Sequence, residues 1–164
     1  MIELTISGLG IDGSNNSPVV LLKEKEGERV IPIWIGPSEA SAIAMEIAGV
    51  KFKRPLTHDL FKQCLIELGV SLQRVFINEL KDNTYFARVF LESGGKVIEL
   101  DARPSDSIAL ALRMKAPILT TDELLESASK IMPKTVTQAE DYDPEALRES
   151  LRKMNPEDFG KFSF

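Results

Sequence analysis

Residues 96–114 constrain the fold of this chain more than any other stretch. The first part alternates between apolar and polar side chains as a β-strand does, and Arg103-Pro104-Ser105-Asp106 then leads into a segment with almost no polar face. Proline at the first helical position followed by an acid is typical of a helix start, because the acid meets unpaired N–H groups and the positive end of the helix dipole. A helix that is apolar nearly all round is buried. The stretch therefore predicts a strand that enters a core helix through a short, charged junction.

The same succession occurs earlier in the chain. Three pairs of segments align: residues 29–31 with 96–98, residues 37–39 with 104–106 and, after a short gap, residues 57–61 with 121–125. This pattern predicts an internal duplication of a unit made of a hairpin, a Pro-Ser-acid helix and a Thr-capped helix, in which Glu39 is equivalent to Asp106. Chance similarity between two ordinary strand-to-helix junctions is the alternative.

Alternating and apolar segments separated by turn residues predict a series of short strands. They are expected at residues 2–8, 18–22, 29–35, 71–80, 84–91, 96–102 and 117–120. Helices are expected at residues 36–48, from Thr57, at residues 104–115 and from Thr121. We therefore expect an α+β fold with a mixed, largely antiparallel sheet, flanking helices and an internal duplication of the hairpin–helix–helix unit.

Local signals refine this expectation. Pro32 cannot donate to a strand ladder, so its strand is expected at a sheet edge or a bulge. Residues 8–16 are rich in turn formers and predict a loop. Thr57 is expected to cap its helix, whose apolar stripe is expected to face the core. This stripe consists of Leu60, Phe61, Cys64, Leu65 and Leu68.

The periodic patterns also divide the chain into segments. Residues 1–130 are expected to form one domain, which is long enough to bury a core. Residues 131–142 show a weak pattern and predict a linker. Residues 143–164 predict a C-terminal helix and a Phe-rich tail, expected to pack on the chain's own core or on a neighbouring subunit.

Composition narrows the class of protein. The formal net charge of −5 argues against a general nucleic-acid coat, because non-specific affinity comes from Lys and Arg that neutralise phosphates. It does not argue against a nuclease, since metal-assisted phosphodiester chemistry uses clustered carboxylates. The single cysteine, Cys64, excludes an internal disulfide and indicates a reducing, cytoplasmic setting. Apolar runs are too short to span a membrane, so no membrane association is expected.

The junction before the core helix holds one candidate site. Asp101 ends its strand on the face opposite the apolar side chains and lies one short turn from Asp106. These two carboxylates have the chemistry to hold Mg²⁺ or Mn²⁺, and Arg103 has the chemistry to hold a phosphate. The alternative needs no metal: Arg103 pairs with Asp101, and Asp106 only caps the helix.

A second candidate site precedes the helix that begins near Thr57. Lys51, Lys53 and Arg54 lead to His58, the only histidine, and to Asp59. Helix N-termini bind anions, and histidine is suited to proton transfer near neutral pH. A surface histidine without a catalytic role is the alternative.

Trp34 occupies the position that aligns with Asp101. Its indole can serve as a platform on which a nucleic-acid base stacks, or it can simply be a core side chain.

Four motifs in this order resemble the bifunctional nuclease domain family. They are residues 30–36 (Val-Ile-Pro-Ile-Trp-Ile-Gly), 54–60 (Arg-Pro-Leu-Thr-His-Asp-Leu), 82–87 (Asp-Asn-Thr-Tyr-Phe-Ala) and 101–110 (Asp-Ala-Arg-Pro-Ser-Asp-Ser-Ile-Ala-Leu). The resemblance covers about residues 1–130 and implies an α+β domain, often oligomeric, with nuclease activity on DNA and RNA. The family's motif positions here are Glu39, His58, Asp59, Asp101, Arg103 and Asp106, whereas Ser107 replaces the usual alanine.

Two functions from different classes remain open at this stage. The leading hypothesis is a metal-assisted phosphodiesterase of low sequence specificity that acts on DNA and RNA as a homo-oligomer. In it, Asp101 and Asp106, with Glu39, hold the cation, His58 or Asp59 activates water, and Arg54 and Arg103 bind phosphate. The alternative is a non-enzymatic regulatory or scaffold domain that binds an anion or a peptide. Metal-dependent cleavage that is lost on single-site mutation distinguishes the two.

Overall fold

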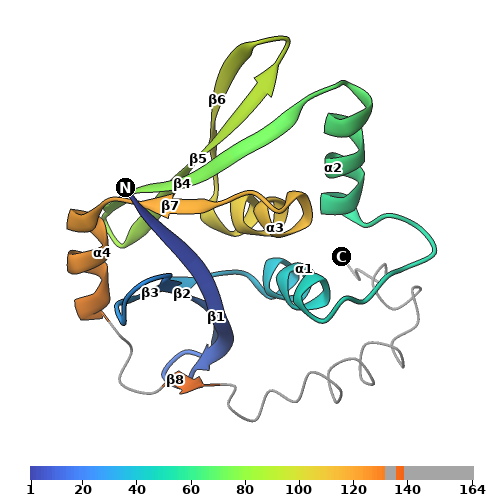
Figure 1. Ribbon diagram of the computed structural model, residues 1–164. Coiled ribbons are helices and arrows are strands. Elements are labelled where there is room, and N and C mark those ends of the chain that lie inside the picture. The colour runs from blue at the N-terminus through green and yellow to red at the C-terminus, as the bar shows by residue number, and fades with distance from the viewer. Residues whose placement is uncertain (132–135, 139–164) are drawn as a thin grey trace.

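A computed structural model describes residues 1–131 and 136–138 of the chain (Figure 1). The strands are β1 (Ile2–Asp12), β2 (Ser17–Glu24), β3 (Val30–Trp34), β4 (Ser71–Lys81), β5 (Thr84–Ser93), β6 (Lys96–Ala102), β7 (Ile118–Thr120) and β8 (Val136–Gln138). The helices are α1 (Pro37–Ile47), α2 (Thr57–Glu67), α3 (Pro104–Met114), α4 (Asp122–Ala128) and the short 3₁₀ helix η1 (Ser129–Ile131).

The described strands form one mixed sheet in the order β3-β2-β1-β7-β4-β5-β6, and β8 pairs with β1 beside this path. Neighbouring strands are antiparallel, except that β4 and β7 run parallel. The expected α+β fold with a largely antiparallel sheet is confirmed. Strand β3 lies at one edge of the sheet, as Pro32 predicted.

Helices α1 and α3 pack against each other, and α3 also contacts β4 and β5 (Figure 1). As its sequence predicted, α3 is buried nearly all round; Ile108 and Ala109 are inaccessible to solvent and even Ser107 is only 1% exposed. Small side chains at these positions let the two helices approach closely. The N-termini of both helices are thereby fixed where β3 and β6 end.

Three local predictions are wrong. Residues 8–12 continue β1, because a bulge between Ile6 and Gly8 lets the strand keep pairing with β2 as far as Asp12. Helix α2 is capped by Leu56 and not by Thr57, which is its first helical residue. The apolar stripe of α2 does not face the core, since Leu65 is the only buried residue among the described residues of that helix.

Strand β6 also departs from expectation. Its alternation predicts that Ile98 and Leu100 lie in an apolar layer, yet they are 45% and 42% exposed. Their partners on β5, Leu91 and Val89, are buried, so the apolar face continues to β6 but no described element covers it there. Figure 1 shows the β5–β6 hairpin extending away from the helices.

Only part of the C-terminal region for which predictions were made is described by the structure. Residues 136–138, within the predicted linker 131–142, form β8 and pair with β1. The predicted helix and Phe-rich tail, residues 143–164, lie outside the described residues. Within the described part of the chain, none of the helices combines the length and apolarity needed to cross a lipid bilayer.

Candidate functional site

Four of the side chains singled out in the sequence meet at the start of α3. The Asp106 carboxylate lies at the centre, with Oδ1 3.0 Å from Nε2 of His58 and Oδ2 2.7 Å from Nε of Arg103. Arg103 also donates through Nη2 to Oε1 of Glu39 at 2.9 Å. We refer to Glu39, His58, Arg103 and Asp106 as the Arg103 cluster. It joins the first turns of α1, α2 and α3.

The position of each acid follows from a shared helix start. Glu39, Asp59 and Asp106 are the third residues of α1, α2 and α3, where an acid faces the unpaired N–H groups and the positive end of the helix dipole. Arg103 is the N-cap of α3, so its side chain leaves the chain beside the same turn. The repeated Pro-Ser-acid sequence therefore delivers Glu39 and Asp106 to one arginine.

The electrostatics of Asp106 favour its ionised form. Burial by itself raises the pKa of this carboxyl, but hydrogen bonds from Arg103 and His58 and their charges outweigh it and leave the pKa below its usual value. The hydrogen bond to Asp106 raises the pKa of Arg103, with a smaller contribution from Glu39. An ionised carboxylate can only accept, so Nε2 of His58 carries the proton of this hydrogen bond. In the neutral imidazole, Nδ1 then carries the free lone pair.

The cluster is accessible to different degrees. The His58 side chain is 16% exposed and that of Asp106 36%, whereas the Arg103 side chain is 67% exposed. His58 and Asp106 line a cavity of about 300 Å³ whose other walls are mainly apolar, including Phe61, Val89 and Leu110. An imidazole that faces a partly apolar cavity and is fixed by a carboxylate is arranged for proton transfer.

Asp59 lies next to His58 in α2 but has a different partner. Its Oδ1 accepts from Nε of Arg113 at 2.7 Å, and its Oδ2 accepts from the N–H of Leu56 at 3.1 Å. Burial raises the pKa of Asp59, but these two hydrogen bonds, chiefly that of Arg113, and the charges of Arg113 and Lys51 outweigh it and leave the pKa below its usual value.

Arg113 is the residue of this site that the sequence did not reveal. It is 5% exposed, and its guanidinium also donates to the backbone carbonyls of Ala109 and Ala42 at 3.0 and 3.2 Å. One side chain of α3 thus holds α1 and the first turn of α2 in place, and His58 is part of that turn. The sequence did contain one signal: Arg113 is a charged residue on an otherwise apolar helix, and a charge that is buried there requires a partner.

The remaining sequence candidates lie outside the cluster. Arg54 and Asp101 are exposed and form no ion pair with the described residues, and Lys51 forms an ion pair with Glu46. No group of three or more His, Cys, Asp or Glu side chains that could hold a metal ion occurs in residues 1–131 and 136–138.

These features describe an α+β domain with a His–Asp–Arg cluster at the point where its core helices begin. The sequence matches the model of the bifunctional nuclease domain over residues 20–133, and the chain belongs to this family. The resemblance of the four motifs is thus confirmed.

Individual relatives are of two kinds. An uncharacterized protein of Mycobacterium tuberculosis is 39% identical over 97% of this chain and 98% of its own length. Bifunctional nuclease 2 of Oryza sativa subsp. japonica is 30% identical over 68% of this chain, and bifunctional nuclease 1 of Arabidopsis thaliana is 29% identical over 62%. The matches cover only 35% and 32% of these plant proteins.

Proposed function

We propose that this protein is a nuclease that hydrolyses phosphodiester bonds in both DNA and RNA with little sequence preference. Membership of the bifunctional nuclease domain family supports the reaction class. The observation that carries the proposal is the Asp106 carboxylate, which contacts His58 through one oxygen and Arg103 through the other. Asp106 thereby holds both His58, which can accept a proton, and Arg103, whose positively charged side chain can bind phosphate.

His58 acts as the general base in this proposal. Its Nε2–H is held by Asp106, so Nδ1 is free to take a proton from the water that attacks phosphorus. The carboxylate keeps the imidazole in this tautomer and stabilises it once it is charged, as in other Asp–His pairs. Asp59 is assigned a positioning role, because its contact with Arg113 fixes the first turn of α2.

Arg103 binds the scissile phosphate. It uses Nε and Nη2 for Asp106 and Glu39, which leaves the outward N–H groups of an exposed guanidinium for phosphate oxygens. Arg54, in the loop before α2, supplies a second positive charge for the nucleic-acid backbone.

A divalent cation completes the proposed site. The acids Glu39 and Asp106 outnumber Arg103, so a phosphodiester meets excess negative charge unless a cation accompanies it. Mg²⁺ and Mn²⁺ bind through few carboxylates together with substrate phosphates. We propose that Asp106 and Asp101 would be the protein ligands, together with substrate phosphate and water, and that a cation held there would stabilise charge on the phosphoryl oxygens.

The nuclease is tested with end-labelled DNA and RNA of the same sequence. We expect His58→Ala and Asp106→Asn to lower the cleavage rate about 10²- to 10⁴-fold, the usual contribution of a general base. The matched control is Glu126→Gln on α4, which removes an exposed carboxylate from its ion pair with Lys130 of η1 and should cleave as the parent does. Circular dichroism verifies that each variant is folded. Cleavage at the parent rate by folded His58→Ala would place the activity elsewhere.

Removal of metal tests the cation separately. We expect EDTA to abolish cleavage and Mg²⁺ or Mn²⁺ to restore it, and Asp101→Asn to raise the metal concentration needed for half-maximal rate. Cleavage that persists in EDTA would exclude the cation but leave the roles of His58 and Arg103 in place. Binding of nucleic acid without any cleavage would favour the non-enzymatic alternative, an anion- or peptide-binding regulatory domain.

We also propose that the chain works as a homo-oligomer. Large apolar side chains are exposed at two places: at Leu60 in α2 and Leu68 just after it, and at Ile98 and Leu100 on one face of β6. Soluble monomers seldom leave so many large apolar side chains exposed together, and an unpaired edge strand readily accepts a partner.

A further inference from the structure

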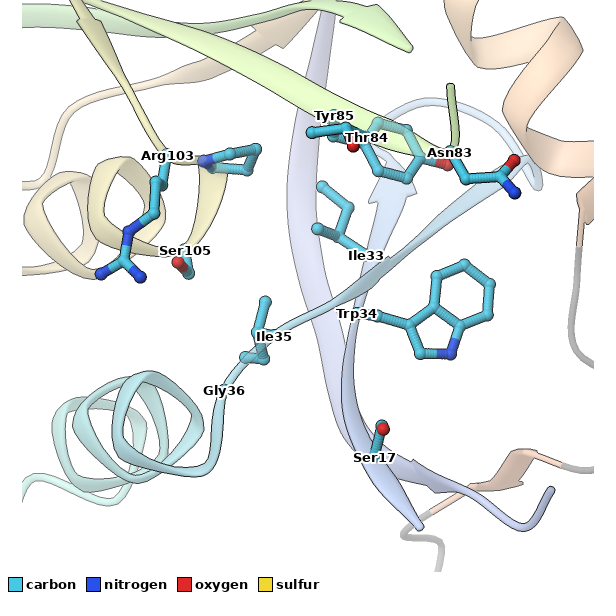
Figure 2. A pocket seen from close by; sticks show the side chains of 11 residues that line it. Ser17, Ile33, Trp34, Ile35, Gly36, Asn83, Thr84, Tyr85, Arg103 and Ser105 are labelled. Carbon is cyan, nitrogen blue, oxygen red and sulfur yellow. The ribbon is translucent and has the colours of Figure 1, made fainter. Parts of the chain in front are cut away.

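A second cavity, of about 400 Å³, lies where β3 enters α1, where β6 enters α3 and at the β4–β5 turn (Figure 2). Its walls include Trp34, Asn83, Tyr85 and Arg103, and we call it the Trp34 cavity. A further space of about 320 Å³ shares Trp34, Asn83 and Tyr85 with it and is bordered by Asp12. The volume is in the range of cavities that bind small organic molecules.

The hydroxyl of Tyr85 is the first sign of a ligand. Tyr85 is only 8% exposed, and its hydroxyl has no hydrogen-bond partner among the described residues. Burial raises the pKa of this phenol to about 12, so it remains a donor at neutral pH. Buried polar groups are nearly always paired, and leaving one unpaired is costly. A ligand that accepts this hydrogen bond removes that cost.

Trp34 and Asn83 supply the chemistry that recognises a base. The indole N–H of Trp34 donates to Oδ2 of Asp12 at 2.8 Å, which fixes the orientation of a ring that stays partly exposed. The amide of Asn83 forms no hydrogen bond with the described residues and offers both donors and an acceptor. Asn83 is held in the left-handed conformation, with φ of 58°, by the tight β4–β5 turn. Figure 2 shows both side chains at the same side of the cavity, with the ring of Tyr85 directed toward Asn83.

Arg103 links this cavity to the Arg103 cluster. Among the described residues, it is the member of the cluster that also lines the Trp34 cavity, and Figure 2 shows its guanidinium turned away from Trp34. A phosphate at the guanidinium therefore lies at the margin of the cavity. Asp12 borders the far space and disfavours a second anion there, so the interior suits an uncharged, planar group.

We propose that the Trp34 cavity is a nucleobase subsite, in which the base of a nucleotide stacks on Trp34 and hydrogen-bonds to Asn83 and Tyr85 while its phosphate lies at Arg103. This inference rests on the proposed nuclease function and names where the enzyme holds a base of its substrate. Stacking is tolerant of base identity, because every base has a π face, and so fits low sequence specificity. A purely structural role of the Trp34–Asp12 hydrogen bond explains the indole N–H but not the unpaired Tyr85 hydroxyl.

The inference is tested by fluorescence, because Trp34 is the only tryptophan of the chain. Parent protein is titrated with 5′-AMP and, as a matched probe, with ribose 5-phosphate, which carries the same phosphate but no base. We expect 5′-AMP to quench the fluorescence of Trp34 in a saturable manner and ribose 5-phosphate to leave it unchanged.

Two variants locate the binding. Tyr85→Phe removes only the hydroxyl and should weaken 5′-AMP binding about fivefold, the effect of one neutral hydrogen bond. Its thermal stability should equal or exceed that of the parent, because the deleted group has no described partner, so weaker binding cannot reflect unfolding. Thr5→Val likewise removes one hydroxyl, from an exposed side chain of β1 that does not line the Trp34 cavity, and should bind as the parent does.

The outcomes separate this inference from the nuclease itself. Base-dependent quenching that Tyr85→Phe weakens supports the subsite even if the protein cleaves no nucleic acid. If cleavage depends on His58 but the two probes act alike, or if Tyr85→Phe binds 5′-AMP as the parent does, the subsite is overturned and the nuclease stands.

Discussion

Arg113 shows how much one buried side chain can organise. Its guanidinium reaches Asp59 at the start of α2, Ala42 in α1 and Ala109 in its own helix. Arginine suits this position because its planar group donates in several fixed directions and stays charged when buried. The position of His58, and with it the proposed role as a base, therefore depends on Arg113, which does not contact His58.

Replacing Arg113 should separate stability from chemistry. We expect Arg113→Met to lower the free energy of unfolding by about 3 kcal/mol, because it leaves Asp59 without its cation and removes the guanidinium hydrogen bonds to the carbonyls of Ala42 and Ala109. Chemical denaturation measures the loss. In the double variant Asp59→Asn/Arg113→Met the loss should be smaller than the sum of the single losses. Additive losses would mean that the two side chains are not energetically coupled.

The two site carboxylates should make stability depend on acid pH. The pKa values of Asp59 and Asp106 are lowered in the folded protein, so their contribution is complete above the unfolded value of about 3.9 and is lost as pH falls below it. We expect the difference in Tm between the parent and Asp106→Asn to shrink from neutral pH to about pH 3. A difference that widens with acid would contradict this sign.

At the scale of elements, short-range patterns were sufficient for the strands and for the starts of α1 and α3, since a proline followed by an acid fixes a helix start locally. They were insufficient where a distant partner decides. Strand β1 runs to Asp12 because β2 pairs with it there, and α2 turns only Leu65 of its stripe into the core and leaves the other stripe residues exposed. The sequence likewise identified most of the charged residues of the site. It could not show that Asp59 hydrogen-bonds to Arg113 and Asp106 to His58, because these partners are far apart in the chain.

The two Thr-initiated helices differ in a way that a pair of substitutions can measure. Thr121 caps α4, and its hydroxyl oxygen accepts from the N–H of Leu124 at 3.1 Å. Thr121→Ala should therefore cost about 1 kcal/mol of unfolding free energy. Thr57 is the first residue within α2 and forms no such bond, so Thr57→Ala is the matched control and should cost much less. Equal losses in denaturant titrations would show that the cap of α4 contributes nothing.

The whole sheet bears on the predicted duplication. Strand β7 lies between two antiparallel sets, β3-β2-β1 on one side and β4-β5-β6 on the other, and each set leads into a helix that begins Pro-Ser-acid. Helices α1 (Pro37–Ile47) and α3 (Pro104–Met114) have the same length of 11 residues. The duplication stays a prediction, which a superposition of residues 18–47 on residues 85–114 tests.

Self-association is the property of the whole molecule that the exposed face of α2 and β6 predicts. Leu68 is 68% exposed, Ile98 and Leu100 on one face of β6 are 45% and 42% exposed, and β6 ends the described sheet with an unpaired edge. Burying such side chains against a second copy gains about 25 cal/mol per Å² of apolar area, whereas a lysine at the same place would have to be desolvated.

We therefore expect the parent chain to elute as an oligomer in size-exclusion chromatography with light scattering, and Ile98→Lys to shift it to the monomer mass. The matched control is Ile47→Lys, an equally drastic change at a side chain that is 47% exposed at the end of α1 and lies outside this face. It should keep the parent mass. Because β6 leads directly into Arg103, dissociation should also lower the rate of cleavage if a neighbouring copy holds this hairpin in place. A monomeric parent, or an Ile98→Lys variant of parental mass, would show that another surface or none mediates assembly.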